Sequence, residues 1–259
     1  MESMILAILQ ARFSSSRLPG KVLKPILGKA MLLFQIERLQ HSKMIGKLVV
    51  ATSDDISDDG IEKICLDNNI EVFRGDLNNV LDRFYQCIRT YNPEHVVRLT
   101  GDCPLADWQV VDQVIQYHLD SNNDYTSNSL PPTYPDGLDV EVVKSEALEE
   151  AWKKATLSSE KEHVTYYINQ RPNDFQIGNF KHSQDLSELR WTVDEPEDFF
   201  FVEKVYQALY KNNPLFTMYD VLSLLKEYPE MTQINNNFNR NEGLIKALEM
   251  DKELFKKNV

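Results

Sequence analysis

The sequence predicts an α/β protein in which a mostly parallel β-sheet is flanked by helices. Short runs rich in Val, Ile and Leu alternate with longer amphipathic stretches through the first half of the chain, an order of elements typical of parallel sheets. The 259 residues are 42% hydrophobic and 26% charged, which suits a globular protein with one sizeable core. No linker or repeat divides the chain, so we expect a single domain over residues 1–259.

The first half of the chain contains strands and helices in alternation. Short apolar runs predict strands at Met4–Leu9, Lys47–Ala51, Ile70–Phe73 and His95–Leu99. Apolar residues at helical spacing predict helices at Met31–Gln40, Asp58–Asn68, Val80–Tyr91 and Trp108–Leu119. Because parallel strands need long crossover connections, this order predicts a parallel sheet covered by helices.

The second half departs from this rhythm. Strand-like runs at Asp124–Asn128 and Leu138–Val143 lie on either side of a Pro-rich loop, which predicts a small antiparallel extension within residues 125–190. We expect this extension to serve in substrate binding and dimerisation. A returning strand is expected at Leu189–Val193. Helices are expected at Glu146–Ala155, Lys161–Gln170, Glu195–Tyr210 and Met218–Glu227, and residues 213–259 form a helical, polar tail.

Charge and composition exclude several classes of protein. The formal net charge of -12 argues against a nucleic-acid partner, because such a surface needs clustered Lys and Arg. No apolar run approaches the roughly 18 residues of a membrane span, and no secretory signal is evident, so we expect a cytoplasmic protein without a membrane partner. Cys65, Cys87 and Cys103 are odd in number and far apart, which favours free thiols.

One basic segment stands out against this acidic background. Between Ser3 and Ile36 there is no Asp or Glu, while Arg12, Arg17 and Lys21 lie in the loop after the first expected strand. The carboxyl end of such a strand is where open α/β sheets bind phosphorylated ligands. The loop lacks the Gly-rich dinucleotide motif and the P-loop ending, so it favours a free nucleoside triphosphate held by cations. The alternative is a solvated basic turn.

Two aspartates are expected at the same edge of the sheet. Asp102 follows an expected strand within Gly-Asp-Cys-Pro, and Asp194 follows Leu189–Val193. A hard cation such as Mg²⁺ needs only one or two carboxylates when phosphate and water supply the other ligands. Each aspartate also has a simpler explanation, because Gly-Asp-x-Pro forms turns and Asp194 stands at an expected helix N-cap.

Seven segments in chain order carry a resemblance to a known family. They match from about Ile5 to Phe201, and the tail segment INNNFNRNEGLIKALEMD matches as well. The chain resembles the cytidylyltransferase family of CMP-acidic-sugar synthetases, and within it the branch of spore coat polysaccharide biosynthesis protein F. The segments are LQARFSSSRLPGKVL, VVATSDD, FRGDLNNVLDRFYQ, VVRLTGDCPL, PDGLDVEVV, EHVTYYI and LRWTVDEPEDFFFVEKV.

The resemblance implies a Rossmann-like fold, usually a homodimer, that transfers CMP from CTP to an acidic sugar with release of pyrophosphate. It also implies Mg²⁺ as cofactor, with Asp102 and Asp194 as the metal-binding aspartates. Arg12, Arg17 and Lys21 match the triphosphate-binding motif, and Arg12, Lys21 and Asp102 form the implied catalytic set. Because synthetases for keto-deoxyoctulosonate carry Gly-Asp-Glu-Pro where this chain has Gly-Asp-Cys-Pro, their acceptor cannot be transferred to this chain.

Further site residues follow from the same resemblance. In the first motif it implies nucleotide contacts near the loop, and in later motifs it implies the base and sugar pocket. The nucleotide-binding residues so implied are Leu9, Ala11, Ser14, Thr52, Ser53, Asp54, Arg74, Asp82 and Arg83. The acceptor-binding candidates are Arg98, Asp139, Glu141 and His163.

The local sequence pattern does not decide whether the acceptor-binding candidates have a functional or a structural role. Asp139 and Glu141 alternate, so their side chains point to one face of a strand, where they could read sugar hydroxyls or simply be solvated. His163 is a substrate-pocket candidate by resemblance, whereas a lone helical His is more often structural. We expect the acceptor to be a nonulosonic acid of the sialic, legionaminic or pseudaminic type, with an octulosonate or a phosphorylated polyol-like acid as second choice.

Two other functions compete with this interpretation. A nucleotide-sugar-dependent glycosyltransferase can share such a nucleotide-binding core, but it normally carries Asp-x-Asp, which Asp102-Cys-Pro lacks. The other alternative is a nucleotide-binding module without catalytic activity, which a turnover assay would distinguish.

Overall fold

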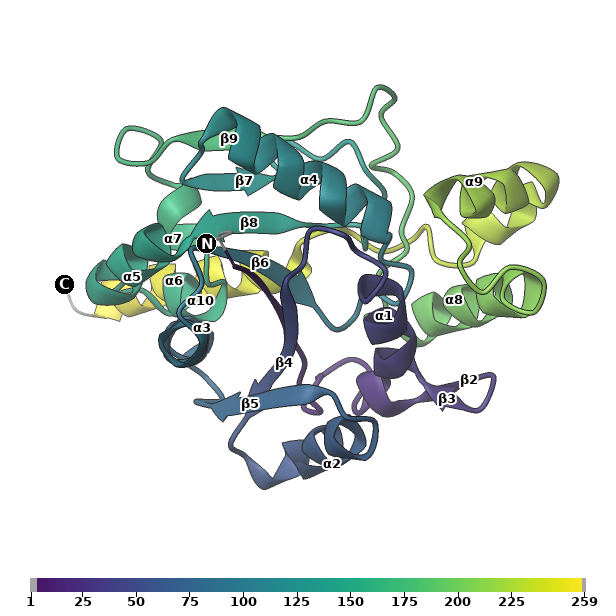
Figure 1. The fold of residues 1–259 in the computed structure, drawn as a ribbon, viewed down its shortest axis with the longest axis horizontal. Helices are drawn as coiled ribbons and strands as arrows, with labels where there is room; N and C mark the ends of the chain where they lie inside the picture. The colour runs from purple at the N-terminus through teal and green to yellow at the C-terminus, as the bar shows by residue number, and fades with distance from the viewer. Residues whose placement is uncertain (1–3, 258–259) are drawn as a thin grey trace.

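A seven-stranded sheet forms the centre of the molecule (Figure 1). The structure is a computed structural model that describes residues 4–257. Across the sheet the strands are ordered β5-β4-β1-β6-β8-β7-β9. Their bounds are Ile5–Gln10 for β1, Lys47–Ser53 for β4, Glu71–Gly75 for β5, His95–Thr100 for β6, Tyr125–Ser127 for β7, Glu141–Lys144 for β8 and Ile177–Asn179 for β9.

The first half of the chain builds the parallel part of this sheet. β4 and β6 pair with β1, and β5 pairs with β4, all in parallel. The crossover helices are α1 Met31–Leu39, α2 Asp59–Asp67, α3 Val80–Tyr91 and α4 Trp108–Ser121. The expected strands and helices of this half are therefore confirmed, and the predicted mostly parallel α/β class is correct. Between β1 and α1 lie the short helix η1 Lys21–Leu23 and a two-stranded antiparallel sheet of β2 Pro25–Ile26 and β3 Lys29–Ala30, and η2 Ile56–Asp58 precedes α2.

Helices cover both faces of the sheet, which explains why β1 is apolar along its whole length. Ala7 and Leu9 belong to one hydrophobic cluster, and Leu6 and Ile8 belong to another. In Figure 1, α3 lies on one side of the strands and α1 on the other. A strand buried on both faces reads as a continuous apolar run, as here, rather than as an alternation.

The expected antiparallel extension is continuous with the central sheet. β8 pairs antiparallel with both β6 and β7, so Arg98 and Glu141 are cross-strand neighbours. β8 begins at Glu141, later than expected, because the Val140 N–H donates to the side chain of Asn128 (2.8 Å). β9, which pairs with β7, was not expected from the sequence. A role of this region in dimerisation stays a prediction.

The strand expected at Leu189–Val193 does not form. The segment is buried at Trp191 and Val193, as its sequence suggests, but its amides bond to two different loops. The Trp191 N–H donates to the Asp136 carbonyl (2.6 Å), and the Val193 N–H donates to the Asp102 carbonyl (2.7 Å). Only an isolated bridge to Asp136 results, and the segment ties these loops together.

One expected helix is broken in the structure. α5 Ser145–Lys154 forms as predicted, but the stretch expected as one helix from Lys161 to Gln170 consists of α6 Ser158–Glu162 and α7 Tyr166–Asn169. Between them Val164 has φ 39°, in the left-handed region that β-branched residues rarely adopt. His163 and Thr165 adjoin this break, and both line the cavity described below.

The C-terminal part adds helices to the edge of the core. α8 Pro196–Leu209 and α9 Met218–Glu227 agree with expectation, and η3 Pro229–Gln233 follows. The last helix, α10 Glu242–Lys257, lies in the tail that was expected to be helical, and it packs on α6. Within residues 4–257 no helix is long and apolar enough to cross a membrane.

Candidate active site

A cavity of about 510 Å³ opens at the carboxyl ends of β1 and β6. Its walls come from the basic loop after β1, the turn after β6, the α6–α7 break, the segment before α8 and the start of α10. The predicted residues that line it are Ala11, Arg12, Arg17, Lys21, Arg83, Arg98, Asp102, Asp139, Glu141, His163 and Asp194.

The basic loop is folded back on itself. The Phe13 N–H donates to the buried carboxylate of Asp58 (2.6 Å), and the Gly20 N–H donates to the Phe13 carbonyl (2.9 Å). Gly20 has φ 69°, a conformation that glycine adopts without strain. This closed loop brings Arg12, Arg17 and Lys21 to the same cavity.

Lys21 connects the two aspartates that were expected to hold a metal. Its Nζ lies 3.1 Å from Asp102 Oδ2 and 2.9 Å from Asp194 Oδ1, and it donates to the Val193 carbonyl at 2.7 Å. Burial lowers the pKa of Lys21, but the two carboxylates outweigh burial and the net pKa is raised. Lys21 is therefore a charged, fixed group at the centre of the site.

Asp102 stays ionised although it is largely enclosed. Burial raises its pKa, but the Lys21 ammonium and hydrogen bonds from Thr100 and Cys103 outweigh burial and lower the pKa to about 2. Asp194 is held differently from expectation. It follows no strand and is not the N-cap of α8, because Glu195 takes that position.

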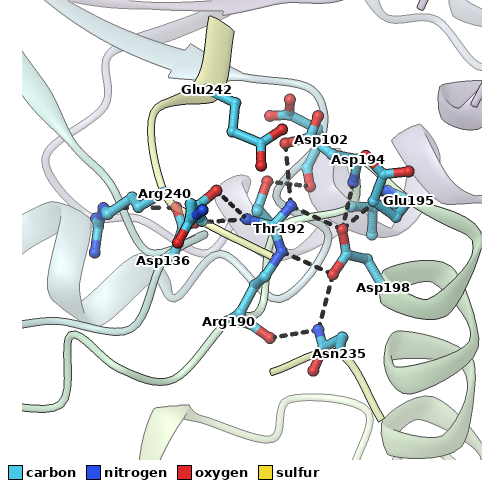
Figure 2. A network of polar contacts seen from close by, with 12 residues as sticks. Asp102, Asp136, Arg190, Thr192, Asp194, Glu195, Asp198, Asn235, Arg240 and Glu242 are labelled. Carbon is cyan, nitrogen blue, oxygen red and sulfur yellow. Dashed lines mark hydrogen bonds and ion pairs between the residues drawn. The ribbon is translucent and has the colours of Figure 1, made fainter. Parts of the chain in front are cut away.

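The residues around Asp194 form the network of Figure 2. Arg190 Nη2 lies 3.3 Å from Asp194 Oδ2, and its guanidinium also makes two contacts of 2.9 Å with the fully buried carboxylate of Asp198. The same Asp198 accepts the backbone N–H of Asp194 and of Glu195, each at 2.9 Å. Both the backbone and the side chain of Asp194 are thus oriented by one buried ion pair.

The two aspartates are suited to a magnesium ion. Because Asp102 and Asp194 both contact one Lys21 nitrogen, their oxygens face a common point. No group of three or more His, Cys, Asp or Glu that could hold a metal occurs among the described residues. Two carboxylates with the rest supplied by phosphate and water is a common arrangement for Mg²⁺, so the residues present fit this ion.

The other two cations of the loop differ in their surroundings. Arg17 contacts Asp194 Oδ2 at 2.9 Å, Glu195 Oε1 at 3.2 Å and Glu242 Oε2 at 2.8 Å. Arg12 is about half exposed and lies 3.9 Å from Glu162, a loose surface pair. Arg12 is therefore available to a ligand, whereas Arg17 is engaged by carboxylates.

Arg83 is a buried cation without a complete set of partners. Its side chain, on α3, is 2% exposed, and its Nε and Nη1 have no hydrogen-bond partner among the described residues. Burial lowers the pKa of Arg83 to about 10, with Asp58 opposing the shift. Leaving such donors unsatisfied costs free energy, about 1–3 kcal/mol per group, so Arg83 is held at this position at a cost in stability.

A polar network lies at the β6–β8 side of the cavity. Arg98 forms an ion pair with Glu141, its cross-strand neighbour, and its Nε donates to Gln10 Oε1 at 3.1 Å. Glu141 Oε1 also accepts hydrogen bonds of 2.5 Å from the hydroxyls of Tyr125 and Thr165. Burial would raise the pKa of Glu141, but Arg98 and the hydroxyls outweigh burial and lower it.

Asp139 lies on the same face as Glu141, as their alternation predicts, and both line the cavity. It forms an ion pair with Arg240, which also lies 3.7 Å from Asp136. Burial and mutual repulsion raise the pKa of Asp136 to about 7, and burial raises the pKa of Asp139 despite Arg240. Both carboxylates are therefore members of ion pairs, and the Asp139 side chain stays partly exposed to the cavity.

His163 faces the cavity from the α6–α7 break. Burial, with Arg98 contributing, lowers its pKa to about 4, so the imidazole is neutral at pH 7. Its Nε2 has no hydrogen-bond partner among the described residues. A ligand in the cavity would meet a neutral ring at this position.

Several predicted nucleotide contacts do not line the cavity, and their role stays a prediction. Arg74 pairs with Asp59 and Glu62 on α2, both at 2.7 Å. Asp82 Oδ1 accepts from Trp152 Nε1 at 2.8 Å. The residues absent from the lining are Leu9, Ser14, Thr52, Ser53, Asp54, Arg74 and Asp82.

The structure adds residues that sequence patterns did not indicate. Asp136, Glu242 and Lys246 line the cavity, and Arg190 orients Asp194. For Glu242 and Lys246 the only signal was the tail segment that resembled the family. Nothing local to these residues predicts chemistry, because their partners come from distant parts of the chain.

Comparisons with known proteins agree with this arrangement. A family model described as cytidylyltransferase matches residues 6–254. The spore coat polysaccharide biosynthesis protein SpsF of Bacillus subtilis is 34% identical over 233 residues, covering 87% of this chain and 95% of that protein. A 3-deoxy-manno-octulosonate cytidylyltransferase of Geobacter sulfurreducens is 32% identical over 111 residues, covering 43% of this chain and 44% of that protein.

A solved structure extends the similarity to the fold. The cytidylyltransferase of Leptospira borgpetersenii is 30% identical and superposes with a TM-score of 0.86, covering 92% of this chain and all of that one. The matched region includes the basic loop, the turn with Asp102 and the segment with Asp194. The chain therefore belongs to the cytidylyltransferase family and is a nucleotidyltransferase.

Proposed function

We propose that the protein transfers CMP from CTP to a hydroxyl group of an acidic sugar, with Mg²⁺ and with release of pyrophosphate. The observation that carries this proposal is the convergence of Asp102, Asp194 and Lys21 on one point of a cavity that Arg12 and Arg17 also line. Carboxylates that suit a divalent cation, beside cations that suit phosphates, are what nucleotidyl transfer from a triphosphate requires.

The reaction is a displacement at the α-phosphorus. The acceptor oxygen forms a bond to phosphorus, the bond from phosphorus to the β-phosphate bridging oxygen breaks, and the hydroxyl proton passes to solvent. Mg²⁺ held by Asp102 and Asp194 would supply charge neutralisation. Arg12, which has only a loose surface partner among the described residues, would hold the β- and γ-phosphates as they leave, together with Arg17 and Lys21 once these two exchange carboxylate contacts for phosphate oxygens. Catalysis on this scheme is positioning and electrostatics, so no covalent nucleophile is needed.

Arg83 supports a preference for cytosine. Its Nε and Nη1 donate to no residue in the described part of the chain, and the cytosine ring offers a carbonyl oxygen and a ring nitrogen on one edge that could accept from them after a small side-chain movement. Burial of the side chain strengthens the preference, since an unsatisfied donor there is costly.

Arg98 supports an acidic acceptor. Glu141 and Gln10 fix one edge of its guanidinium, and its Nη2 donates to no residue in the described part of the chain. A planar guanidinium with free N–H groups suits a carboxylate. The names of the Bacillus and Geobacter relatives connect those proteins with a polysaccharide and with an octulosonate. We propose a nonulosonic acid as the first choice and an octulosonate as the second.

Pyrophosphate release tests this function. CTP, UTP, ATP and GTP would each be offered with N-acetylneuraminic, legionaminic, pseudaminic and 3-deoxy-manno-octulosonic acids in the presence of Mg²⁺. We expect release with CTP and at least one acid, and at least about tenfold less with UTP, because a mispaired buried polar group costs about 1–3 kcal/mol. Equal rates with UTP or a purine would contradict the cytidylyl assignment. Binding of CTP without release would favour a non-catalytic module.

A further inference from the structure

The C-terminal end of the chain runs along the cavity. Asn235 Nδ2 donates to the Arg190 carbonyl and to Asp198 Oδ1, both at 2.9 Å. Arg240 contacts Asp136 and Asp139 on the other side of the site. Asp251 on α10 accepts from the backbone N–H groups of Ser158 and Ser159, at 3.1 and 3.3 Å. We call residues 234–253 the C-terminal strap, and Figure 2 shows part of it beside Asp102 and Asp194.

Glu242, in the strap, contacts Arg17, one of the cations that we propose bind phosphate. It lies in the first turn of α10, lines the cavity, and its Oε2 is 2.8 Å from Arg17 Nη1. Figure 2 shows its side chain extending toward Asp102. The contact joins residues that are 225 positions apart in the sequence. It is a charge-assisted hydrogen bond of the kind that a phosphate oxygen would make with the same nitrogen.

Arg17 cannot keep all of its carboxylate partners and also hold a triphosphate. The negative charge of Asp194 would be balanced by the Mg²⁺ that we propose binds there, and Glu195 is the N-cap residue of α8. Glu242 is neither a proposed metal ligand nor an N-cap residue, so Arg17 is its functional contact in the described structure. A phosphate placed on Arg17 Nη1 would meet the Glu242 carboxylate at close range, where like charges repel.

We propose that Glu242 competes with the β- and γ-phosphates of the nucleotide for Arg17, so that the C-terminal strap regulates entry to the site. Without nucleotide, the Glu242 carboxylate holds Arg17. When CTP binds, the carboxylate gives up this contact, and it takes Arg17 again as pyrophosphate leaves. This inference rests on the proposed function, because it takes Arg17 as a ligand of the triphosphate.

Binding of CTP measures the competition directly. Calorimetry with Mg²⁺ and without an acceptor keeps CTP intact, and it gives the Kd for the wild type, Glu242→Gln and Glu249→Gln. Glu249 is an exposed carboxylate of the same helix and makes no ion pair among the described residues, so it is the matched control. We expect Glu242→Gln to lower the Kd for CTP about three- to tenfold and Glu249→Gln to leave it unchanged.

Two further measurements locate the effect. In an Arg17→Ala background the gain from Glu242→Gln should vanish, because the competition acts through Arg17. For CMP, which lacks the β- and γ-phosphates, the gain should be less than twofold. Melting temperatures of all variants, measured alongside, check that each one is folded.

The outcomes separate this inference from the proposed function. If Glu242→Gln leaves the Kd for CTP unchanged or raises it, Glu242 does not compete with nucleotide. A gain that survives in the Arg17→Ala background, or that is equal for CTP and CMP, also overturns the inference. Failure of the wild type to bind CTP or to release pyrophosphate contradicts the proposed function instead.

Discussion

At the scale of single residues, the site is a cluster of oppositely charged side chains that form ion pairs with one another. Lys21 bridges Asp102 and Asp194, and Arg17 contacts Asp194 as well. Such a cluster orders its members before a ligand arrives, because each side chain is held by more than one partner. Preorganised charge of this kind is the main source of catalytic power that we propose for the protein.

Asp102→Asn tests the metal assignment. The amide keeps the shape of the side chain but removes its negative charge, so we expect kcat for pyrophosphate release to fall roughly 100-fold or more. Asp120→Asn, which changes an exposed carboxylate on α4, is the matched control and should keep wild-type turnover. Turnover of Asp102→Asn close to the wild-type value at saturating Mg²⁺ would rule out a metal on this residue.

At the scale of elements, contacts between loops connect the residues before β8 with the segment before α8, and both line the cavity. The loop before β8 carries Asp136 and Asp139, and it contacts the Trp191–Thr192 backbone before α8. Gly137, in this loop, has φ 108°, and a Cβ built on it would lie 2.5 Å from the Thr192 nitrogen and 2.6 Å from the Trp191 carbonyl carbon. No side chain can be accommodated there without movement of backbone.

Gly137→Ala should therefore be strongly destabilising. Both the positive φ and the clash with backbone act against it, and we expect a loss of about 2–4 kcal/mol in the free energy of unfolding. Gly28→Ala provides the comparison, since Gly28 has φ 84° but nothing within 4 Å of the added Cβ, so its loss should be about 1–2 kcal/mol. Urea denaturation of both variants checks this order, and equal losses would show that the contact with residues 191–192 is unimportant.

At the scale of the whole molecule, a buried histidine pair joins α4 to the sheet. His95 Nδ1 and His118 Nε2 are 3.0 Å apart, and His118 Nδ1 lies 3.0 Å from Thr126 Oγ1. Burial, with His95 and Lys144 contributing, lowers the pKa of His118 to about 3, while Asp124 opposes the shift. The folded protein thus keeps this ring neutral over a pH range in which the unfolded chain would protonate it.

His118 should make the fold sensitive to acid. The pKa of His118 is lower in the folded state than the unfolded value near 6.5. Its contribution to the free energy of unfolding is therefore fully present above about pH 6.5 and is lost as pH falls toward 3. Between pH 6 and 4 the free energy of unfolding should fall by up to about 1.4 kcal/mol per pH unit for this proton. His118→Gln should remove that part of the slope in urea titrations at each pH, whatever its stability at pH 7. An unchanged slope would contradict the assignment.

The sequence by itself determined the parallel half of the sheet and the position of the basic loop. These features are local: burial on both faces makes β1 an apolar run, and Arg12, Arg17 and Lys21 stand close together in the chain. The position of Asp102 was also predictable, because the end of a buried strand can be located from the strand itself. Resemblance to the family then supplied the reaction, which spacing alone would not have done.

Only the tertiary structure decided how the site is completed. The helix expected through His163 is broken because Val164 adopts a left-handed conformation between α6 and α7, which no local pattern predicts. Leu189–Val193 looks like a strand, yet its amides bond to two loops instead of one neighbour. Glu242 reaches Arg17 across 225 residues of sequence. Contacts between residues so far apart in the sequence depend on how whole elements pack. The local sequence around each residue therefore does not predict its partner.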